Sequence, residues 1–513
     1  MLHRQIVNII NFIRDVEPRL PTDLVTPVRE QIRLMKELSL RGTFLIQYDA
    51  LIDPVYQELL KPLDPAQFEI GVWFETVQPQ VEAAGLVWRG RFPWDWHANC
   101  GFSVGYTKPE REKLVDVLYE KFREVFGYYP RIFGSWFFDS HTVRYAADKY
   151  GMDALCNCKE QYGTDGYTLW GGYYGQGYYP SRRNVFMPAR DAEDQLNVPL
   201  FRMLGSDPVY QYDFGTDPET GSAAVQGVIT LEPVYTGNTG GGGVPSWVDW
   251  YLKENFNGDC LSFGYAQAGQ ENSFSWPGMK DGLTHQFHEL ARLQAEGKLT
   301  VEPLGDTGRW YKETYDYTPA SAIVAHTAFD DPERRSVWYS TKNYRVNLYA
   351  DHGTLRIRDL HIFDAALTDP YEDTVATTNE AVYDTLPVID GNRYTGAGIL
   401  AGGYLSFADG SAPQADTMTF EELGSGCARV TFGEAVFELN ESGITIRAAK
   451  PFVLENRIGV DGGHLPTTIA RTEDTLTLSY RGVQYSVRLA KGRFLNDRTM
   501  ESDGCELVME LAD

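Results

Sequence analysis

The sequence has little of what marks a disulfide-stabilised, exported or membrane-bound protein. Its 513 residues include six cysteines, which is few for this length, and only Cys156 and Cys158 stand close together in the sequence. We therefore expect reduced thiols. No apolar run is long enough to cross a membrane, and the N-terminus shows no apolar signal segment with a cleavage site. These absences predict a cytoplasmic protein with no membrane partner.

Positive charge is also scarce. Lysine and arginine together number 46, against 71 aspartates and glutamates, which gives a net charge of -25. The field of such a chain repels phosphates, so we expect no nucleic acid as the main partner. Composition leaves the oligomeric state open.

Aromatic residues, by contrast, are abundant. The chain has 31 Tyr, 26 Phe and 11 Trp, and many stand in runs that also contain Gly, Asp or Asn. For a single aromatic residue, a place in the core is the simpler explanation. Runs of rings mixed with hydrogen-bonding groups suit the apolar faces and hydroxyl edges of sugars, and they predict a carbohydrate substrate. The runs are FPWDWH (92–97), SWFF (135–138), YTLWGGYYGQGYY (167–179) and FSWP (274–277).

The first 325 residues alternate short apolar runs with amphipathic stretches. This alternation predicts parallel strands joined by helices, and seven or eight such units predict a closed (β/α) barrel over 1–325. Short alternating runs separated by Gly, Asn and Asp follow, and they predict an antiparallel β-sandwich over 326–513. The expected strands are 6–13, 42–49, 68–75, 131–138, 152–159, 198–205 and 260–267, and the expected helices include 21–42, 107–127, 140–151 and 282–298.

Catalytic groups of parallel barrels gather at the carboxyl ends of the strands. Glu75, Asp139 and Glu271 follow three of the expected strands. Asp139 directly precedes the helix 140–151 and could serve only as its N-cap, whereas Glu75 and Glu271 stand among aromatics and amides that can raise a carboxyl pKa. Glycosidic chemistry needs one acid as proton donor and a second as nucleophile or base. We predict Asp139 and Glu271 as the working pair, with Glu75 third.

Further polar and aromatic residues near the same strand ends are expected to bind the substrate. Arg14 and Asp15 would fix hydroxyl groups, and three tryptophans would supply stacking surfaces. Lys159 and Asp165 also follow an expected strand. The predicted substrate-binding residues are Arg14, Asp15, Trp73, Trp136, His141, Gln270 and Trp276.

Four segments follow one another in the first 155 residues: IINFIRDVEP, RGTFLIQYDAL, FEIGVWFETVQP and YYPRIFGSWFFDSHTVRYAADKYGMDA. Their order resembles the NodB-type polysaccharide deacetylase superfamily. The resemblance covers about residues 5–155 and is strongest in RGTFLIQ, FEIG and AADKYGMDA. The barrels of glycoside hydrolase families 57 and 38 are similar in plan. The resemblance implies a (β/α)7 barrel followed by β-rich domains.

The same resemblance implies a divalent metal held by paired aspartates after the first strand and two histidines on the third. Here the first strand is followed by Arg14-Asp15, and the third carries Trp73, Glu75 and Gln78 without a histidine. We therefore expect no metal held in that way, and no other cofactor. Two acid–imidazole pairs, Asp95 with His97 and Asp139 with His141, leave a rearranged metal site open, although a surface loop and a helix cap explain them more simply.

The favoured function is a metal-independent glycoside hydrolase that cleaves a small glycoside or oligosaccharide with two carboxylates at the barrel mouth. A carbohydrate deacetylase with a rearranged metal site is one alternative, and a noncatalytic sugar-binding protein is another. The identity of the sugar, its anomer and the stereochemical course stay open.

Overall fold

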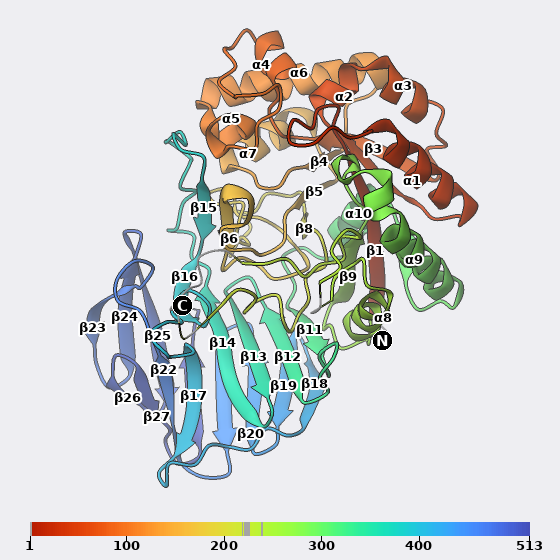
Figure 1. Cartoon of the computed structure of the whole chain (residues 1–513). Helices are drawn as coiled ribbons and strands as arrows, with labels where there is room; N and C mark the ends of the chain where they lie inside the picture. Colours follow the sequence, from red (N-terminus) through yellow and green to blue (C-terminus); the bar gives the residue numbers. More distant parts are fainter. Residues whose placement is uncertain (1–2, 218, 220–225, 238–239, 513) are drawn as a thin grey trace.

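The computed structural model describes residues 3–217, 219, 226–237 and 240–512. Its N-terminal part is a barrel-like parallel sheet with helices packed around it (Figure 1). Strands pair in the order β1-β2-β3-β4-β5-β8, and β9 and β10 each pair with β1. Within the described residues no pairing joins β8 to β9, so the barrel is nearly but not fully closed. The strands are β1 (Arg4–Ile13), β2 (Gly42–Ile46), β3 (Phe68–Trp73), β4 (Ile132–Gly134), β5 (Ala154–Asn157), β8 (Leu200–Arg202), β9 (Phe263–Ala268) and β10 (Thr300–Glu302), with β7 (Gly177–Tyr178) antiparallel to β8.

The helices that follow these strands start and stop where local chemistry predicts. Helix α6 (Lys108–Phe126) begins with a reciprocal capping box between Thr107 and Glu110 and ends at Gly127, whose φ of 84° is left-handed. Helix α9 begins earlier than predicted, at Trp276, because Pro277 suits its first turn. The other helices are α1 (Val25–Glu37), α2 (Tyr48–Ile52), α3 (Pro54–Leu60), α4 (Gln78–Ala83), α5 (Ala98–Gly101), α7 (Ser140–Tyr150), α8 (Pro245–Asn255), α9 (Trp276–Ala295) and α10 (Leu304–Thr314).

None of the helices in the described part of the chain is long and apolar enough to span a membrane. The six cysteines, all within the described residues, are free thiols.

The C-terminal part consists of two antiparallel sheets (Figure 1). Strands such as β19 and β20 alternate buried and partly exposed residues, as expected for sheets with one face in a core. The predicted α/β class, with a barrel followed by a β-sandwich, is confirmed. One sheet contains β11 (Ser321–Ala325), β12 (Arg334–Ser340), β13 (Tyr344–Asp351), β14 (Thr354–Ile362), β16 (Leu386–Asp390), β17 (Gly402–Phe407), β22 (Phe452–Arg457), β26 (Arg493–Asn496) and β27 (Thr499–Glu501). The other contains β18 (Met418–Gly424), β19 (Cys427–Phe432), β20 (Ala435–Asn440), β21 (Gly443–Ala448), β23 (Thr467–Arg471), β24 (Thr475–Tyr480), β25 (Val483–Lys491) and β28 (Glu506–Glu510).

The two parts of the chain are joined by more than one connection. Strand β15 (Ala381–Asp384) pairs in parallel with β6 (Tyr167–Trp170), which follows β5 near the barrel mouth. Strand β11 pairs with β12 and so lies in an antiparallel sheet, just before the proposed boundary between 325 and 326. The sequence pattern did not predict β6 or β15, because each is short and its partner is distant along the chain.

Candidate active site

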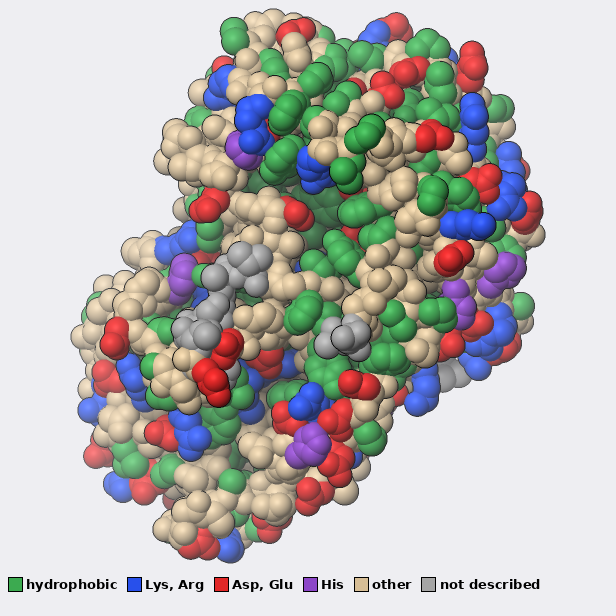
Figure 2. Space-filling view, in the orientation of Figure 1, with side chains coloured by type: hydrophobic (Ala, Val, Ile, Leu, Met, Phe, Trp, Pro, Cys, Tyr) green, Lys and Arg blue, Asp and Glu red, His purple; other side chains and the backbone are tan. Residues whose placement is uncertain are grey.

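A cavity of about 730 Å³ opens at the carboxyl ends of the barrel strands. Side chains that follow six different strands line it, as expected for a parallel barrel. In the space-filling view the upper part of the molecule is hollowed, with hydrophobic side chains inside the hollow (Figure 2). The lining residues that follow the strands include Arg14 and Glu17 after β1, Glu75 after β3, Trp136 after β4, Cys158 and Lys159 after β5, Leu204 after β8 and Glu271 after β9.

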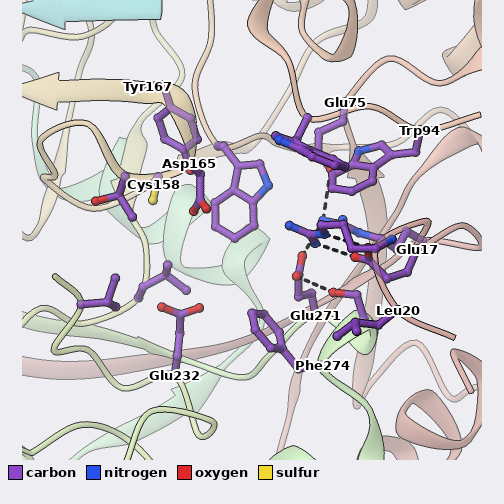
Figure 3. Close-up of a pocket in the computed structure, with 18 of the residues that line it drawn as sticks. Glu17, Leu20, Glu75, Trp94, Cys158, Asp165, Tyr167, Glu232, Glu271 and Phe274 are labelled. Carbon is purple, nitrogen blue, oxygen red and sulfur yellow. Dashed lines mark hydrogen bonds and ion pairs between the residues drawn. The ribbon is translucent and has the colours of Figure 1, made fainter. Parts of the chain in front are cut away.

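Arg14 organises the acids on one side of this cavity. Its side chain is 3% exposed, and its Nη2 lies 2.5 Å from Glu271 Oε2 and 3.5 Å from Glu75 Oε2 (Figure 3). Glu17 Oε2 lies 3.8 Å from Nη1. The guanidinium also lies 4.1 Å from the centre of the Trp94 ring. Because Glu75 and Glu271 contact the same nitrogen, their Oε2 atoms lie within about 6 Å of each other. Arg14 therefore compensates two buried carboxylates at once.

Glu75 is held in place by the residue two positions before it. Trp73 Nε1 donates to Glu75 Oε2 at 2.8 Å, and Gln47 Nε2 donates to the same oxygen at 3.2 Å. Burial raises the pKa of Glu75, and the charge of Arg14 opposes that change. The Trp73 ring stacks on Phe12 at 4.2 Å and is 1% exposed. Trp73 thus holds Glu75 in position by a hydrogen bond but does not itself line the cavity.

Glu271 has a donor on each carboxylate oxygen. Arg14 Nη2 donates to Oε2, and Ser273 Oγ donates to Oε1 at 2.5 Å. Its side chain is 4% exposed, yet it lines the cavity. Arg14 and Ser273 together hold the Glu271 carboxylate in a fixed position at the cavity wall.

A further acid, Glu232, faces this cluster from the opposite side of the cavity (Figure 3). It is 4% exposed, and Thr230 Oγ1 donates to its Oε2 at 2.9 Å. The pKa of Glu232 is raised to about 7, mainly by burial; the hydrogen bond from Thr230 and the charge of Lys159 oppose this rise, and the charge of Glu271 adds to it. A carboxyl group with this pKa carries a proton in a large fraction of molecules at neutral pH. Glu232 can therefore donate a proton to a ligand in the cavity.

Each aromatic run that the sequence shows contributes at least one ring to the cavity wall. Figure 3 shows Phe274 between Glu232 and Glu271, Tyr167 beside Cys158 and Asp165, and Trp94 beside Glu75. Trp136 lines the cavity and packs edge-on against Trp73 at 5.2 Å. The cavity therefore combines flat apolar walls with carboxylates, which is the combination that sugar rings require.

Asp139 lies elsewhere. It is 0% exposed, caps α7 by accepting the Thr142 N–H at 2.9 Å, and lies 2.8 Å from Arg111 Nη1. It is not among the residues that line the cavity. The structure therefore does not bring Asp139 to Glu271, and the geometry gives it the N-cap role that its position before a helix also predicts.

Several other predicted binding residues also lie outside the cavity lining. His141 Nε2 lies 3.0 Å from Glu112 Oε1 on α6. Trp276 is partly buried in the first turn of α9. Gln270 is 1% exposed, and its backbone N–H donates to Asn11 at 3.2 Å. Asp15 is half-buried and its N–H donates to Asp49 at 3.1 Å. Of the predicted residues, the lining therefore includes Arg14, Glu75, Trp136 and Glu271.

The residues present do not fit the divalent metal that the family resemblance implies. Arg14 and Glu75 pair with each other at the expected position. Over the described ranges, no group of three or more His, Cys, Asp or Glu side chains could hold a metal ion. Asp95 forms an ion pair with Arg91, whose Nη2 lies 2.8 Å from Asp95 Oδ1, and His97 Nδ1 lies 3.9 Å from the same oxygen. The acid–imidazole pairs therefore do not converge into a metal centre.

Sequence reasoning missed Glu232 as a site residue. It lies in the segment 226–237, which has no regular secondary structure and so no strand end to mark it. Lys159 and Asp165 also line the cavity, and their position after β5 was a usable signal.

Comparison with known proteins bears on the fold. Family models match no part of the chain, and no curated protein matches it. A solved glycoside hydrolase/deacetylase candidate from Parabacteroides distasonis is similar, with a TM-score of 0.55 and 15% identity over 76% of this chain and 92% of that chain.

Two other solved structures are more distant. A polysaccharide deacetylase candidate from Mycobacterium smegmatis has a TM-score of 0.36 and 14% identity, over 61% of this chain and 92% of that chain. A GH57 branching enzyme from Thermococcus kodakaraensis has a TM-score of 0.31 and 9% identity, over 62% of this chain and 72% of that chain. The chain has the fold of the Parabacteroides distasonis structure.

Proposed function

We propose that this protein is a carbohydrate-active enzyme, and specifically a glycoside hydrolase. Glu232 donates a proton to the glycosidic oxygen, and the Glu271 carboxylate acts as nucleophile or as base toward water. Glu75 is the second carboxylate on Arg14 and stabilises positive charge that develops on the sugar ring.

One observation carries this proposal: two carboxyl groups with different surroundings, Glu232 and Glu271, face each other across one aromatic-walled cavity. The pKa of Glu232 is raised to about 7 by burial, whereas Glu271 accepts hydrogen bonds from Arg14 and Ser273. Glycoside cleavage needs this division of roles, because one acid must give a proton while the other carries a negative charge.

The surroundings assign roles to the remaining side chains. Arg14 holds Glu75 and Glu271 in fixed positions, so no reorganisation of these charges is needed during the reaction. Trp136 and Phe274, which are both partly exposed, offer ring faces for the apolar side of a sugar. The cavity volume of about 730 Å³ suits a ligand of one to a few sugar units.

The similar structure from Parabacteroides distasonis is described as a glycoside hydrolase/deacetylase, which supports carbohydrate as the substrate class. Of those two activities we favour hydrolysis, because the acids in this cavity match its requirements and the donor set does not match that of a metal-dependent deacetylase. A noncatalytic sugar-binding protein is an outcome of the test below.

Aryl glycosides with good and poor leaving groups test the role of Glu232. A good leaving group departs without protonation, so Glu232→Gln should keep most of its activity on such substrates and lose about 10²- to 10⁴-fold on poor ones. The panel should contain neutral and acidic sugars of both anomeric forms. Equal losses on both leaving groups would contradict the general-acid role, and sugar binding without turnover by the wild type would leave only the binding function.

A further inference from the structure

Lys159 lines the cavity but takes no part in the proposed chemistry. It follows β5, and its side chain is 3% exposed. The only hydrogen bond from its Nζ to a described residue goes to the backbone carbonyl of Glu160 at 3.4 Å. No carboxylate oxygen in the described part of the chain lies within ion-pair distance of Nζ. A buried amine without an acidic partner is costly, so it requires an explanation.

The other cations of the cavity differ from Lys159 in this respect. Arg14 lies 2.5 Å from Glu271, and Arg19 lies 2.5 Å from Glu17. Their charges are compensated within the protein. Among the described cations that line the cavity, Lys159 is thus the one whose positive charge has no carboxylate partner at ion-pair distance.

The acids near Lys159 do not supply the missing partner. Glu160 adjoins it in sequence, but its carboxylate lies 2.6 Å from Arg345 Nη1 on β13 and 3.6 Å from Arg202 Nη2. Glu232 carries a proton in a large fraction of molecules at neutral pH, because burial raises its pKa to about 7. Asp165 is exposed to solvent. The electrostatic effects of Cys158, Glu232, Asp165 and Glu160 do not outweigh burial, which lowers the pKa of Lys159.

We infer that the sugar substrate carries an anionic group, a carboxylate or a sulfate, that binds the ammonium group of Lys159. This inference rests on the proposed function, since it concerns the same cavity. An anionic group of the ligand would supply the ion-pair partner that Lys159 lacks within the protein. The flexible lysine side chain can place its ammonium group next to such an anion. The net charge of -25 repels such a ligand at long range, but salt screens that field beyond about 8 Å, whereas the contact inside the cavity is short.

Binding measurements with defined sugars test this inference independently of turnover. Methyl glycosides of glucuronate and galacturonate, their neutral glucose and galactose counterparts, and the 6-sulfated forms are titrated into the wild type by calorimetry. We expect at least one anionic form to bind about tenfold more tightly than its neutral counterpart. Comparison of the uronates with the sulfates shows which anion the site prefers.

Lys159→Met removes the charge and keeps the length of the side chain. It should abolish the preference for the anionic sugar and leave the affinity for the neutral one unchanged, while Lys159→Arg should retain part of the preference. Lys280→Met, at an exposed position of α9, is the matched control and should change nothing. Thermal unfolding verifies folding, and Lys159→Met should be as stable as the wild type or more so, because it removes a buried charge without a partner.

The outcomes separate the two proposals. Neutral sugars that bind and are cleaved, with no gain for the anionic forms, would overturn the inference about Lys159 and leave the proposed function standing. An anionic preference that persists in Lys159→Met would overturn it as well. Failure of every sugar to bind would contradict the proposed function and this inference together.

Discussion

Replacement of Glu232 by Gln should stabilise the protein while it removes activity on substrates with poor leaving groups. Burial raises the pKa of Glu232 from 4.5 to about 7, so the folded protein binds this proton more tightly than the unfolded chain does. Stability is therefore lost as the pH rises from 4.5 through 7. Gln does not titrate and can still accept the hydrogen bond from Thr230 Oγ1, so it avoids that loss.

The magnitude follows from the two pKa values. The ionisation of Glu232 costs the folded state about 3 kcal/mol at pH 8 and about 1 kcal/mol at pH 5. The free energy of unfolding of Glu232→Gln should therefore exceed that of the wild type by an amount that grows by about 2 kcal/mol between these pH values. If Glu232 only formed a structural ion pair, its replacement would lower the free energy of unfolding, because loss of a buried ion pair destabilises the fold.

Urea unfolding of both proteins at pH 5 and pH 8 measures this difference. Glu313→Gln, at an exposed position of α10, is the control and should show no pH-dependent gain. A Glu232→Gln variant that is less stable than the wild type by the same amount at both pH values would refute the reasoning, because it would mean that Glu232 is ionised and paired throughout.

Two further predictions concern Asp139 and Trp136. Asp139→Asn breaks the buried ion pair with Arg111 and weakens the α7 cap. Urea unfolding should therefore show that the free energy of unfolding falls by about 3 kcal/mol or more, while the protein that stays folded keeps its kcat. Normal stability together with lost turnover would instead identify Asp139 as a catalytic residue. Trp136→Ala removes a partly exposed ring from the cavity wall, and the loss of about 1 kcal/mol of stacking should raise KM about fivefold with little change in stability; an unchanged KM for every sugar that is cleaved would exclude Trp136 as a stacking surface.

The architecture was predictable because its signals are local. Apolar runs and helix starts such as Thr107 with Glu110 depend on neighbours a few residues away, and the structure places β1, β3 and α6 where these patterns predict them. Glu271 could be selected for the same reason, since it follows a strand of the barrel.

The site was only partly predictable because its geometry depends on distant residues. Asp139 and Glu75 both follow barrel strands, but they have different partners. Arg111 on α6 pairs with Asp139, which is a buried helix cap, whereas Trp73 donates a hydrogen bond to Glu75, which faces the cavity. Glu232 comes from an irregular segment, and its raised pKa results from burial that periodicity does not reveal. A position at the end of a strand thus predicts that a residue lies near the barrel mouth, while its contacts in the folded protein decide whether it lines the cavity.

The pH dependence of kcat/KM on a substrate with a poor leaving group tests the central claim most directly. In the proposed mechanism the active form holds Glu232 protonated, so kcat/KM should fall as the pH rises through about 7. In Glu232→Gln, measured with a good leaving group, this alkaline decline should be absent. A wild-type profile that stays flat from pH 6 to 9, or a decline near pH 7 that persists in Glu232→Gln, would contradict Glu232 as the proton donor.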